Sequence, residues 1–382
     1  MNGVGPRPRS SRLRGLGQAV RLTLRRLRLQ ALAWVLPLWA LAAATPSYAS
    51  VYPSLSSRAA LIAAMRQTPG TRLLYGVLPL PGTIGQLAQW EIGTYLLVCT
   101  GLMAVLMTCR MLRTDEDEGL VEVLRGAGAG RWVPFLAPVL VVFGVVAVHA
   151  AGTGVVMTAL TGRVKELTVS GAWALAGTVA VVGWAFAGAG AAASQLARSA
   201  GAARGLSLGL LGTAFALRVL ADEADAPWAR RLSPLAWRDL VEPYTRDRVA
   251  LLAACAACCP VLVAGAGALY ARREYLGGYL PDRSASRRRW RVHGRAGLLA
   301  RLCLRPLAAW TVAAVCLSTL FGTMAGGVTD LLRPGSATAQ MVDKMASGSP
   351  VAQFMGLLTV FTVLLVVVAA VGQAGALARS ER

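Results

Sequence analysis

Charge is scarce in this chain. Only 15% of its 382 residues are Asp, Glu, Lys or Arg, whereas 55% are hydrophobic. A soluble domain needs a larger charged fraction to cover its surface, so this composition indicates a membrane protein. Lysine is almost absent, since only Lys165 and Lys344 occur, and neither follows a glycine-rich loop that binds nucleotide phosphates. We therefore expect this chain to hold no cofactor of its own, with any ATP and Mg²⁺ bound by a separate chain.

Histidine and cysteine form no recognisable reactive centre. The chain has two histidines and seven cysteines, and no nucleophile–base pair or metal-ligand cluster stands out. The cluster Cys255-Ala-Ala-Cys-Cys259 has a spacing found in metal sites, but no second cysteine pair and no nearby histidine completes it. We interpret its thiols as small packing residues. The sequence therefore predicts no metal site and no enzyme.

Long apolar runs are what the chain has in abundance. A helix of roughly 20 apolar residues crosses a hydrocarbon core about 30 Å thick. The predicted fold class is an all-α membrane protein, a polytopic helical bundle of about eight transmembrane helices. These spans are predicted at residues 31–50, 92–112, 133–160, 172–196, 205–220, 249–271, 306–328 and 352–378.

The positions of the basic residues predict the orientation. The net charge is +21, and arginines are concentrated in residues 1–30 and 272–305. With residues 1–30 inside, about two thirds of the 39 Lys and Arg residues fall on the cytoplasmic side, as the positive-inside rule requires. We expect a multi-pass plasma-membrane protein with both termini cytoplasmic, in contact with lipid and not with nucleic acid. The loop at 221–248 is the main exception, because it carries five arginines on the predicted outer side.

An internal repeat is suggested by the entries to two spans. Arg26-Leu-Arg-Leu-Gln-Ala-Leu-Ala-Trp34 resembles Arg301-Leu-Cys-Leu-Arg-Pro-Leu-Ala-Ala-Trp310. Repeated bundle halves are a common architecture of transporters. The first apolar run also fits a signal peptide, because Pro46-Ser-Tyr-Ala-Ser50 looks like a cleavage site. The repeat favours a retained span, since an internal copy cannot be a signal peptide.

Four regions follow from this pattern. Residues 1–30 form a basic, amphipathic cytoplasmic or interfacial segment. Residues 31–271 form a six-span bundle, and residues 272–305 a basic cytoplasmic linker whose arginines we expect to be solvated. Residues 306–382 are the first two spans of an incomplete second repeat.

A dense charged segment follows the second span. Residues 112–125 read as a short cytoplasmic helix with acids in its first turns, where they suit the helix dipole, and an apolar side beyond. Such a helix can bind a groove of a soluble partner, with apolar side chains for affinity and acids for register. The alternative is a solvated charged loop. The predicted partner-coupling residues are Arg113, Asp115, Glu116, Asp117, Glu118, Gly119, Glu122 and Leu124.

The fourth span and three ionisable residues complete the prediction. Gly183, Gly188 and Gly190 predict close helix packing. The ionisable groups of the spans are Glu91, His149 and Arg218. They form no evident proton relay, and we expect His149 to be a hydrogen-bonded packing residue.

Three motifs give the chain a family resemblance. Arg113-Thr-Asp-Glu-Asp-Glu-Gly-Leu-Val-Glu-Val-Leu124 is similar to the Arg-x-Glu-Glu-x-Gly-x-x-Glu-x-Leu of type-2 ABC exporter permeases of the polyether-antibiotic, tetronasin-like class. The segments Leu232-Ser-Pro-Leu-Ala-Trp237 and Ala271-Arg-Arg-Glu-Tyr-Leu-Gly-Gly-Tyr-Leu280 extend the resemblance. It implies a permease that works with a cytoplasmic ABC ATPase dimer and exports amphiphilic drugs or polyketides. In that family residues 112–125 would be the coupling element.

The chain departs from this family in two ways. Asp115 stands where the family has Glu. Such permeases also resemble two six-span halves, so four spans are absent here, and we expect a chain that is truncated, split over two genes with a second permease chain supplying the missing spans, or inactive alone.

Three hypotheses remain. The first is an ATP-driven permease of amphiphilic compounds. The second is a membrane-embedded transferase that would use the acids of loop 221–248, and the third is an inactive or truncated permease remnant. The candidate acids of the transferase are Asp222, Glu223, Asp225, Asp239, Glu242 and Asp247.

Overall fold

The computed structural model contains two compact units, Met1–Arg58 with Tyr75–Ser284, and Ala59–Leu74 with Ala285–Arg382. The structure describes residues 12–51, 53–56, 58–59, 62–63, 73–224, 226–280 and 311. Almost all of these belong to the first unit. The predicted spans at 306–328 and 352–378, and with them the proposed second repeat, lie outside the described residues.

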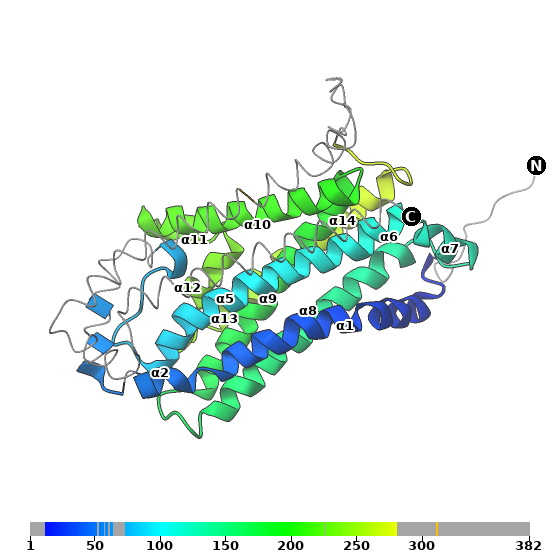
Figure 1. Ribbon diagram of the computed structural model, residues 1–382. Helices are drawn as coiled ribbons and strands as arrows, with labels where there is room; N and C mark the ends of the chain where they lie inside the picture. The colour runs from blue at the N-terminus through cyan, green and yellow to red at the C-terminus, as the bar shows by residue number, and fades with distance from the viewer. Residues whose placement is uncertain are drawn as a thin grey trace, which may run out of the picture. The chain divides into compact units, whose positions relative to one another are not determined.

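The first unit is a bundle of helices that run side by side (Figure 1). Six of its helical segments are long and apolar enough to cross a membrane. The long helices are α1 (Leu16–Ala43), α5 (Ile84–Cys109), α8 (Val133–Leu160), α9 (Val169–Leu196), α10 (Ala200–Glu223) and the pair α13 (Ala250–Ala256) and α14 (Cys258–Arg272). Shorter elements are α2 (Pro46–Val51), η2 (Arg110–Thr114), α6 (Asp115–Asp117), α7 (Leu120–Gly126), α11 (Pro227–Arg230), η3 (Pro234–Ala236) and α12 (Trp237–Val241). The first six predicted spans fall on these long helices, and the prediction of an all-α polytopic membrane fold is confirmed.

Two helices begin earlier than the apolar pattern indicates. Helix α1 starts at Leu16, so one continuous helix includes part of the basic segment and the first span. Helix α5 starts at Ile84 because Thr83 and Gln86 form a reciprocal capping box there. The carboxylate of Glu166, in the α8–α9 loop, also accepts a hydrogen bond of 2.8 Å from the Ile84 N–H. Two of the N–H groups that a helix start leaves unpaired are thus satisfied by side chains.

Helix α9 lies at the centre of the bundle, packed against α5, α8, α10 and α14. Glycine makes this close packing possible. A Cβ atom on Gly183 would lie 2.6 Å from Cγ1 of Val146, and one on Gly188 would lie 2.8 Å from Cβ of Leu262. Such distances leave no room for a side chain, so the predicted close packing of the fourth span is confirmed at these two glycines.

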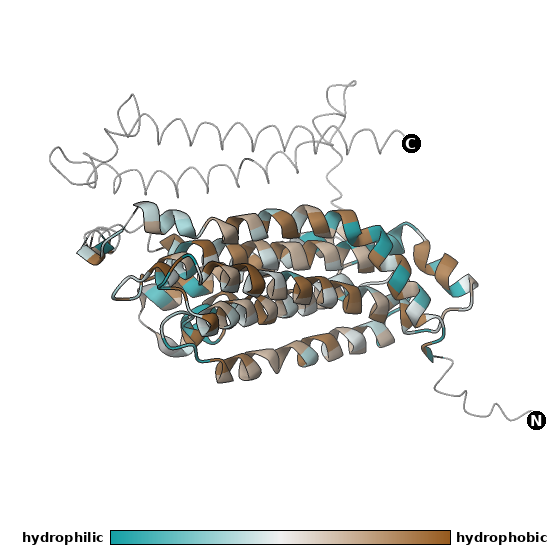
Figure 2. Ribbon diagram, turned by 90° about the horizontal axis from the view of Figure 1, so that it is seen from below, coloured by the Kyte–Doolittle hydropathy of each residue, from teal (hydrophilic) through white to brown (hydrophobic). Residues whose placement is uncertain are grey.

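The surface of the bundle is apolar along its length and more polar toward its ends (Figure 2). Leu36, Val155 and Val261 are large apolar side chains that are well exposed. In water this exposure would be unfavourable, whereas lipid tails solvate such groups. Inside the bundle, His149 is fully buried and its Nε2 lies 3.0 Å from the Thr100 hydroxyl. This contact agrees with a hydrogen-bonded packing residue.

Candidate functional site: an ion-pair cluster at one end of the bundle

The predicted coupling segment begins where α5 changes its helical geometry. The last turn of α5 continues into the π-helical turn η2 and then into α6. A π-turn inserts one extra residue into a helix, so every later side chain rotates relative to a regular α-helix. This rotation turns Arg113 and Glu116 into the bundle, where both are buried.

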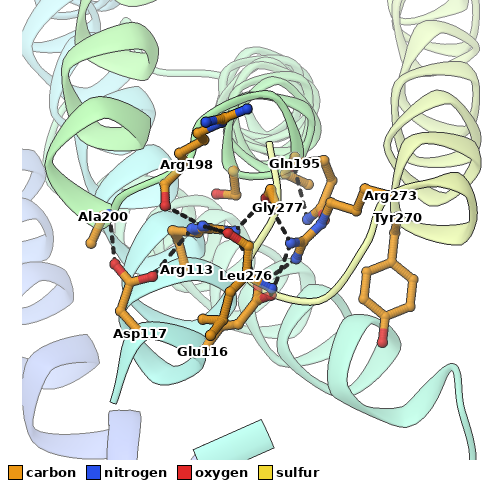
Figure 3. A network of polar contacts seen from close by, with 12 residues as sticks. Arg113, Glu116, Asp117, Gln195, Arg198, Ala200, Tyr270, Arg273, Leu276 and Gly277 are labelled. Carbon is orange, nitrogen blue, oxygen red and sulfur yellow. Dashed lines mark hydrogen bonds and ion pairs between the residues drawn. The ribbon is translucent and has the colours of Figure 1, made fainter. Parts of the chain in front are cut away.

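Arg113 is the centre of the buried cluster (Figure 3), with a side chain only 1% exposed. Its guanidinium donates to the carbonyl oxygens of Leu276 and Gly277 at 3.0 Å each, and also to the carbonyl of Arg198. It forms ion pairs with Glu116 at 3.4 Å and, through Nε, with Asp117 at 3.3 Å. One side chain thus connects the end of α5 with the turn after α9 and the turn after α14.

Glu116 joins the same cluster to α14. Arg273 donates to both carboxylate oxygens of Glu116, to Oε1 over 2.8 Å and also to Oε2. The Leu276 N–H donates to Oε1 over 2.9 Å, and Nε of Arg273 donates to Oε1 of Gln195, on α9, over 2.7 Å. The side chains of Glu116 and Arg273 are 3% and 6% exposed. A two-pronged arginine–carboxylate pair with this geometry is a strong, directional contact.

The neighbouring acids make further connections between helices. Arg26 of α1 donates to both carboxylate oxygens of Asp115, over 2.6 and 3.0 Å. The Ala200 N–H, at the start of α10, donates to Oδ2 of Asp117 over 2.8 Å. An acid is favourable at that helix start because of the helix dipole. The acidic segment therefore ties α5 to α1, α9, α10 and α14 at one end of the bundle.

The predicted single helix over residues 112–125 is wrong. Gly119 has φ +76°, in the left-handed region, and divides the segment into α6 and α7. The structure also changes the role of three predicted partner contacts, since Arg113 is buried in the cluster described above. Asp115 and Glu116 are buried and bind Arg26 and Arg273, so they present no surface to a partner in this conformation.

Other residues of the predicted set do reach the surface. Glu118 and Glu122 are exposed, and Leu124 is half-buried. Val123, between them, is 71% exposed. The turn at Glu118 and helix α7 therefore place two outward-facing acids and an apolar side chain in one short segment.

The other face of α7 contacts the buried cluster. Val121 is buried and lines a small cavity together with Glu116 and Arg273. Nη2 of Arg125 lies 3.3 Å from the Tyr270 hydroxyl, and its guanidinium stacks 5.4 Å from the ring centre of Tyr275. Helix α7 thus rests on the junction between α5 and α14.

Sequence reasoning missed the basic half of the cluster. Arg273 belongs to the linker whose arginines were expected to be solvated, yet it is buried. The expectation was wrong for this residue. Helix α14 ends at Arg272 and the backbone at Arg273 is extended, so the Arg273 side chain no longer follows the helical turn. The motif Ala271–Leu280 contained the signal, since the contacts made by Arg273, Leu276 and Gly277 all fall within it.

Three of the candidate acids of loop 221–248, Asp222, Asp239 and Glu242, line one cavity, but each of them is paired with an arginine. Asp222 binds Arg230 at 3.1 Å, and Asp239 binds Arg238 at 3.1 Å. The first ion pair joins the last turn of α10 to α11 and the second lies within α12, so both are structural contacts of the end opposite the Arg113 cluster.

Together these observations define a class of protein: a polytopic α-helical membrane protein with a buried polar junction at one end of its bundle. Comparison with known proteins is more specific. Residues 293–382 match the family described as "Multidrug efflux system permease Rv1217c, C-terminal domain". The chain is also 30% identical over 374 residues to the multidrug efflux system permease protein Rv1217c of Mycobacterium tuberculosis (strain ATCC 25618 / H37Rv).

That alignment covers 95% of this chain and 65% of the relative, so the chain spans about two thirds of the length of the protein it matches. Both similarities confirm the predicted resemblance to the permease subunit of an exporter. They also agree with the prediction of a transport subunit rather than an enzyme.

Proposed function

We propose that this chain is the permease subunit of an ATP-driven exporter of amphiphilic compounds, and that α7 transmits the action of a separate cytoplasmic ATPase. The observation that carries the proposal is the two-faced position of α7. Its outward face presents Glu122 and Val123 to solvent, next to the exposed Glu118 of the turn before it, and its inward face rests on the Arg113 cluster.

The outward face has the chemistry of a docking element. An exposed apolar side chain gives affinity when a partner groove covers it, and flanking acids fix the register against basic residues of the partner. The basic surroundings of this acidic element support the role, because most of the basic residues are expected at this end of the bundle. An acidic element there attracts a partner surface that the rest of this end repels.

The inward face provides the mechanical connection. A partner that displaces α7 also moves Val121 and Arg125, which contact the region of Glu116, Tyr270 and Arg273. The end of α5 and the end of α14 share that ion-pair cluster, so its rearrangement changes how these helices pack. Coupling requires an element with two discrete arrangements that both sites bias, and a small set of exchangeable ion pairs fits that requirement.

The proposal includes the assembly and its orientation. ATP and Mg²⁺ are bound by the partner ATPase, which acts as a dimer. The chain lies in the plasma membrane with both termini cytoplasmic, which places α7 inside the cell. The printed name of the relative, a multidrug efflux permease, supports amphiphilic compounds as cargo.

Co-purification with a co-expressed ATPase tests the coupling. We expect the double substitution Glu118→Lys and Glu122→Lys to abolish association while leaving the thermal stability of the bundle unchanged, because both side chains are exposed. Lys165→Glu is the matched control, since it reverses an exposed charge in the α8–α9 loop at the other end. Equal recovery of the ATPase with the parent, the double variant and the Lys165→Glu control would refute the role of α7.

Orientation is tested separately with a membrane-impermeant thiol reagent on intact cells. Cysteine introduced at the exposed position Val123 should react only after the membrane is opened, whereas cysteine at Lys165 should react at once. Reaction of the Val123→Cys variant from outside would contradict the proposed topology, since α7 could then never meet a cytoplasmic ATPase.

A further inference from the structure

Helix α1 carries three exposed arginines near the end of the bundle that holds the Arg113 cluster. These are Arg21, Arg25 and Arg28, which we call the arginine stripe. Arg26, in the same turns, points inward and binds an acid of α6. In contrast, no side chain of the arginine stripe forms an ion pair or a hydrogen bond with a residue that the structure describes. The charge of the stripe is therefore available to a partner outside the bundle.

The arginine stripe continues into an apolar surface on the same side of α1. Positions 21, 25, 28, 32 and 36 are spaced by three or four residues, which places them on one side of an α-helix. Leu32 and Leu36 are exposed like the arginines, and α1 is continuous from Leu16 to Ala43. At 1.5 Å per residue, Leu32 lies only about 6 Å beyond Arg28 along the helix axis. The charged part of this side thus ends where a surface suited to acyl chains begins.

Exposed leucines also alternate with the arginines. Leu24 and Leu29 are 49% and 72% exposed in the turns of the arginine stripe. Helix α1 packs mainly against α8 and lies along the outside of the bundle (Figure 1). Exposed leucine is unfavourable in water, and arginine is unfavourable in hydrocarbon. A surface that carries both at one level fits the boundary of a membrane, where arginine binds headgroup phosphates and leucine enters the acyl layer.

We infer that the arginine stripe is a docking surface for an anionic phospholipid, whose phosphate binds two neighbouring arginines while an acyl chain lies along Leu32 and Leu36. Charge complementarity favours this ligand, because residues 1–30 contain eight arginines and no acid. The planar guanidinium group also matches the geometry of a phosphate. A zwitterionic headgroup gains less, since its own ammonium group offsets its phosphate. An acidic protein surface is a poorer partner, because it would place charged groups against the exposed leucines.

The inference does not depend on the proposed ATPase, because no residue of the arginine stripe belongs to α7 or to the Arg113 cluster. Native mass spectrometry of the full chain, purified in a neutral detergent, tests it directly. The probes are dioleoyl phosphatidylglycerol and dioleoyl phosphatidylcholine, which share their acyl chains and differ in headgroup charge.

Phosphatidylglycerol should bind more tightly than phosphatidylcholine. A basic residue near an anionic headgroup contributes roughly fivefold to binding, so two arginines should give the first phosphatidylglycerol molecule an affinity about 25-fold higher. The preference should shrink as the salt concentration is raised. Equal affinities for the two lipids would overturn the inference and would leave an acidic protein as the partner of this surface.

Substitutions assign the preference to the arginine stripe. Replacing all three of its arginines by Gln should remove the preference, and Arg25→Gln alone should reduce it about fivefold, because Arg25 belongs to either neighbouring pair. The matched control removes the same net charge from three exposed arginines at the opposite end of the bundle, through Arg231→Gln, Arg246→Gln and Arg248→Gln. An unchanged preference in the folded Arg25→Gln protein, or an equal loss in the control, would refute the site even if the triple variant of the stripe fails to fold.

Discussion

The ion pair between Glu116 and Arg273 gives the sharpest test of how this bundle is held together. The substitution Glu116→Gln keeps the shape of the side chain and an oxygen for the Leu276 N–H, but it removes the charge. Two buried guanidinium groups, those of Arg113 and Arg273, then share a region that has lost its central carboxylate. Among the residues that the structure describes, only Asp117, which is partly exposed, remains as a counter-charge within ion-pair distance of Arg113.

The expected loss is large because these groups are buried. Removing one partner of a buried ion pair costs about 3–5 kcal/mol, since the remaining charge stays desolvated without compensation. For a bundle of this size that corresponds to a fall of roughly 6–20 °C in the apparent melting temperature. Since Gln retains one hydrogen bond, we expect a value in the lower half of that range.

Thermal denaturation in a detergent or lipid nanodisc measures this loss, and a double-mutant cycle separates the pair from its surroundings. Arg273→Gln should also destabilise the bundle, but the double variant should lose about 1–3 kcal/mol less than the sum of the single losses. Glu274→Gln is the control, because Glu274 is adjacent in sequence but exposed. A melting temperature of Glu116→Gln within 1 °C of the parent, or strictly additive losses, would refute the claim that these side chains form a buried pair.

Three further outcomes are expected from the same measurement. The two hydrogen bonds from Arg58 to Glu166 lower the pKa of the Glu166 carboxyl below its usual range. The stabilisation from this carboxylate is therefore fully present above about pH 4.5 and is lost as the pH falls through the lowered pKa. Over that fall in pH, the difference in melting temperature between the parent and Glu166→Gln should shrink to zero. Gly183→Ala should cost about 1–3 kcal/mol through overpacking, whereas Gly144→Ala, with open space around it, should leave stability unchanged or raise it. Gly119→Ala meets no neighbour but forces alanine into left-handed geometry, so it should cost about 1–2 kcal/mol, and a smaller loss with Gly119→Asn would identify the backbone as the cause.

The positions of the spans could be predicted because lipid imposes a length and a composition that the sequence displays directly. A run such as residues 133–160 is apolar on all sides, and the structure begins and ends α8 at those residues. The earlier start of α5 depends instead on the Thr83–Gln86 capping box and on Glu166, which is distant in sequence. A hydropathy pattern contains no information about such a cap.

The candidate site was predicted only in part, for two physical reasons. The π-turn η2 adds one residue to the helical register, so a regular helical projection assigns Asp115 and Glu116 to the wrong faces. Arg273 is one of ten arginines in residues 272–305, and the sequence composition around it does not distinguish it from the other nine. The end of α14 at Arg272 distinguishes it in the structure, together with its contacts to Gln195 and Glu116 on other helices.

The arrangement at this end explains why one acidic segment can serve both stability and coupling. The acids of α6 hold α1, α10 and α14 against the end of α5, while Glu118 and Glu122 leave an exposed surface open to a partner. Gly119 separates α6 from α7 by a left-handed residue, so α7 can tilt without unwinding α6. A tilt of α7 would first change the contacts of Val121 and Arg125 and would reach Glu116 and Arg273 only through them. Substitutions on the outward face should therefore uncouple the subunits with little loss of stability, and substitutions in the cluster should do the reverse.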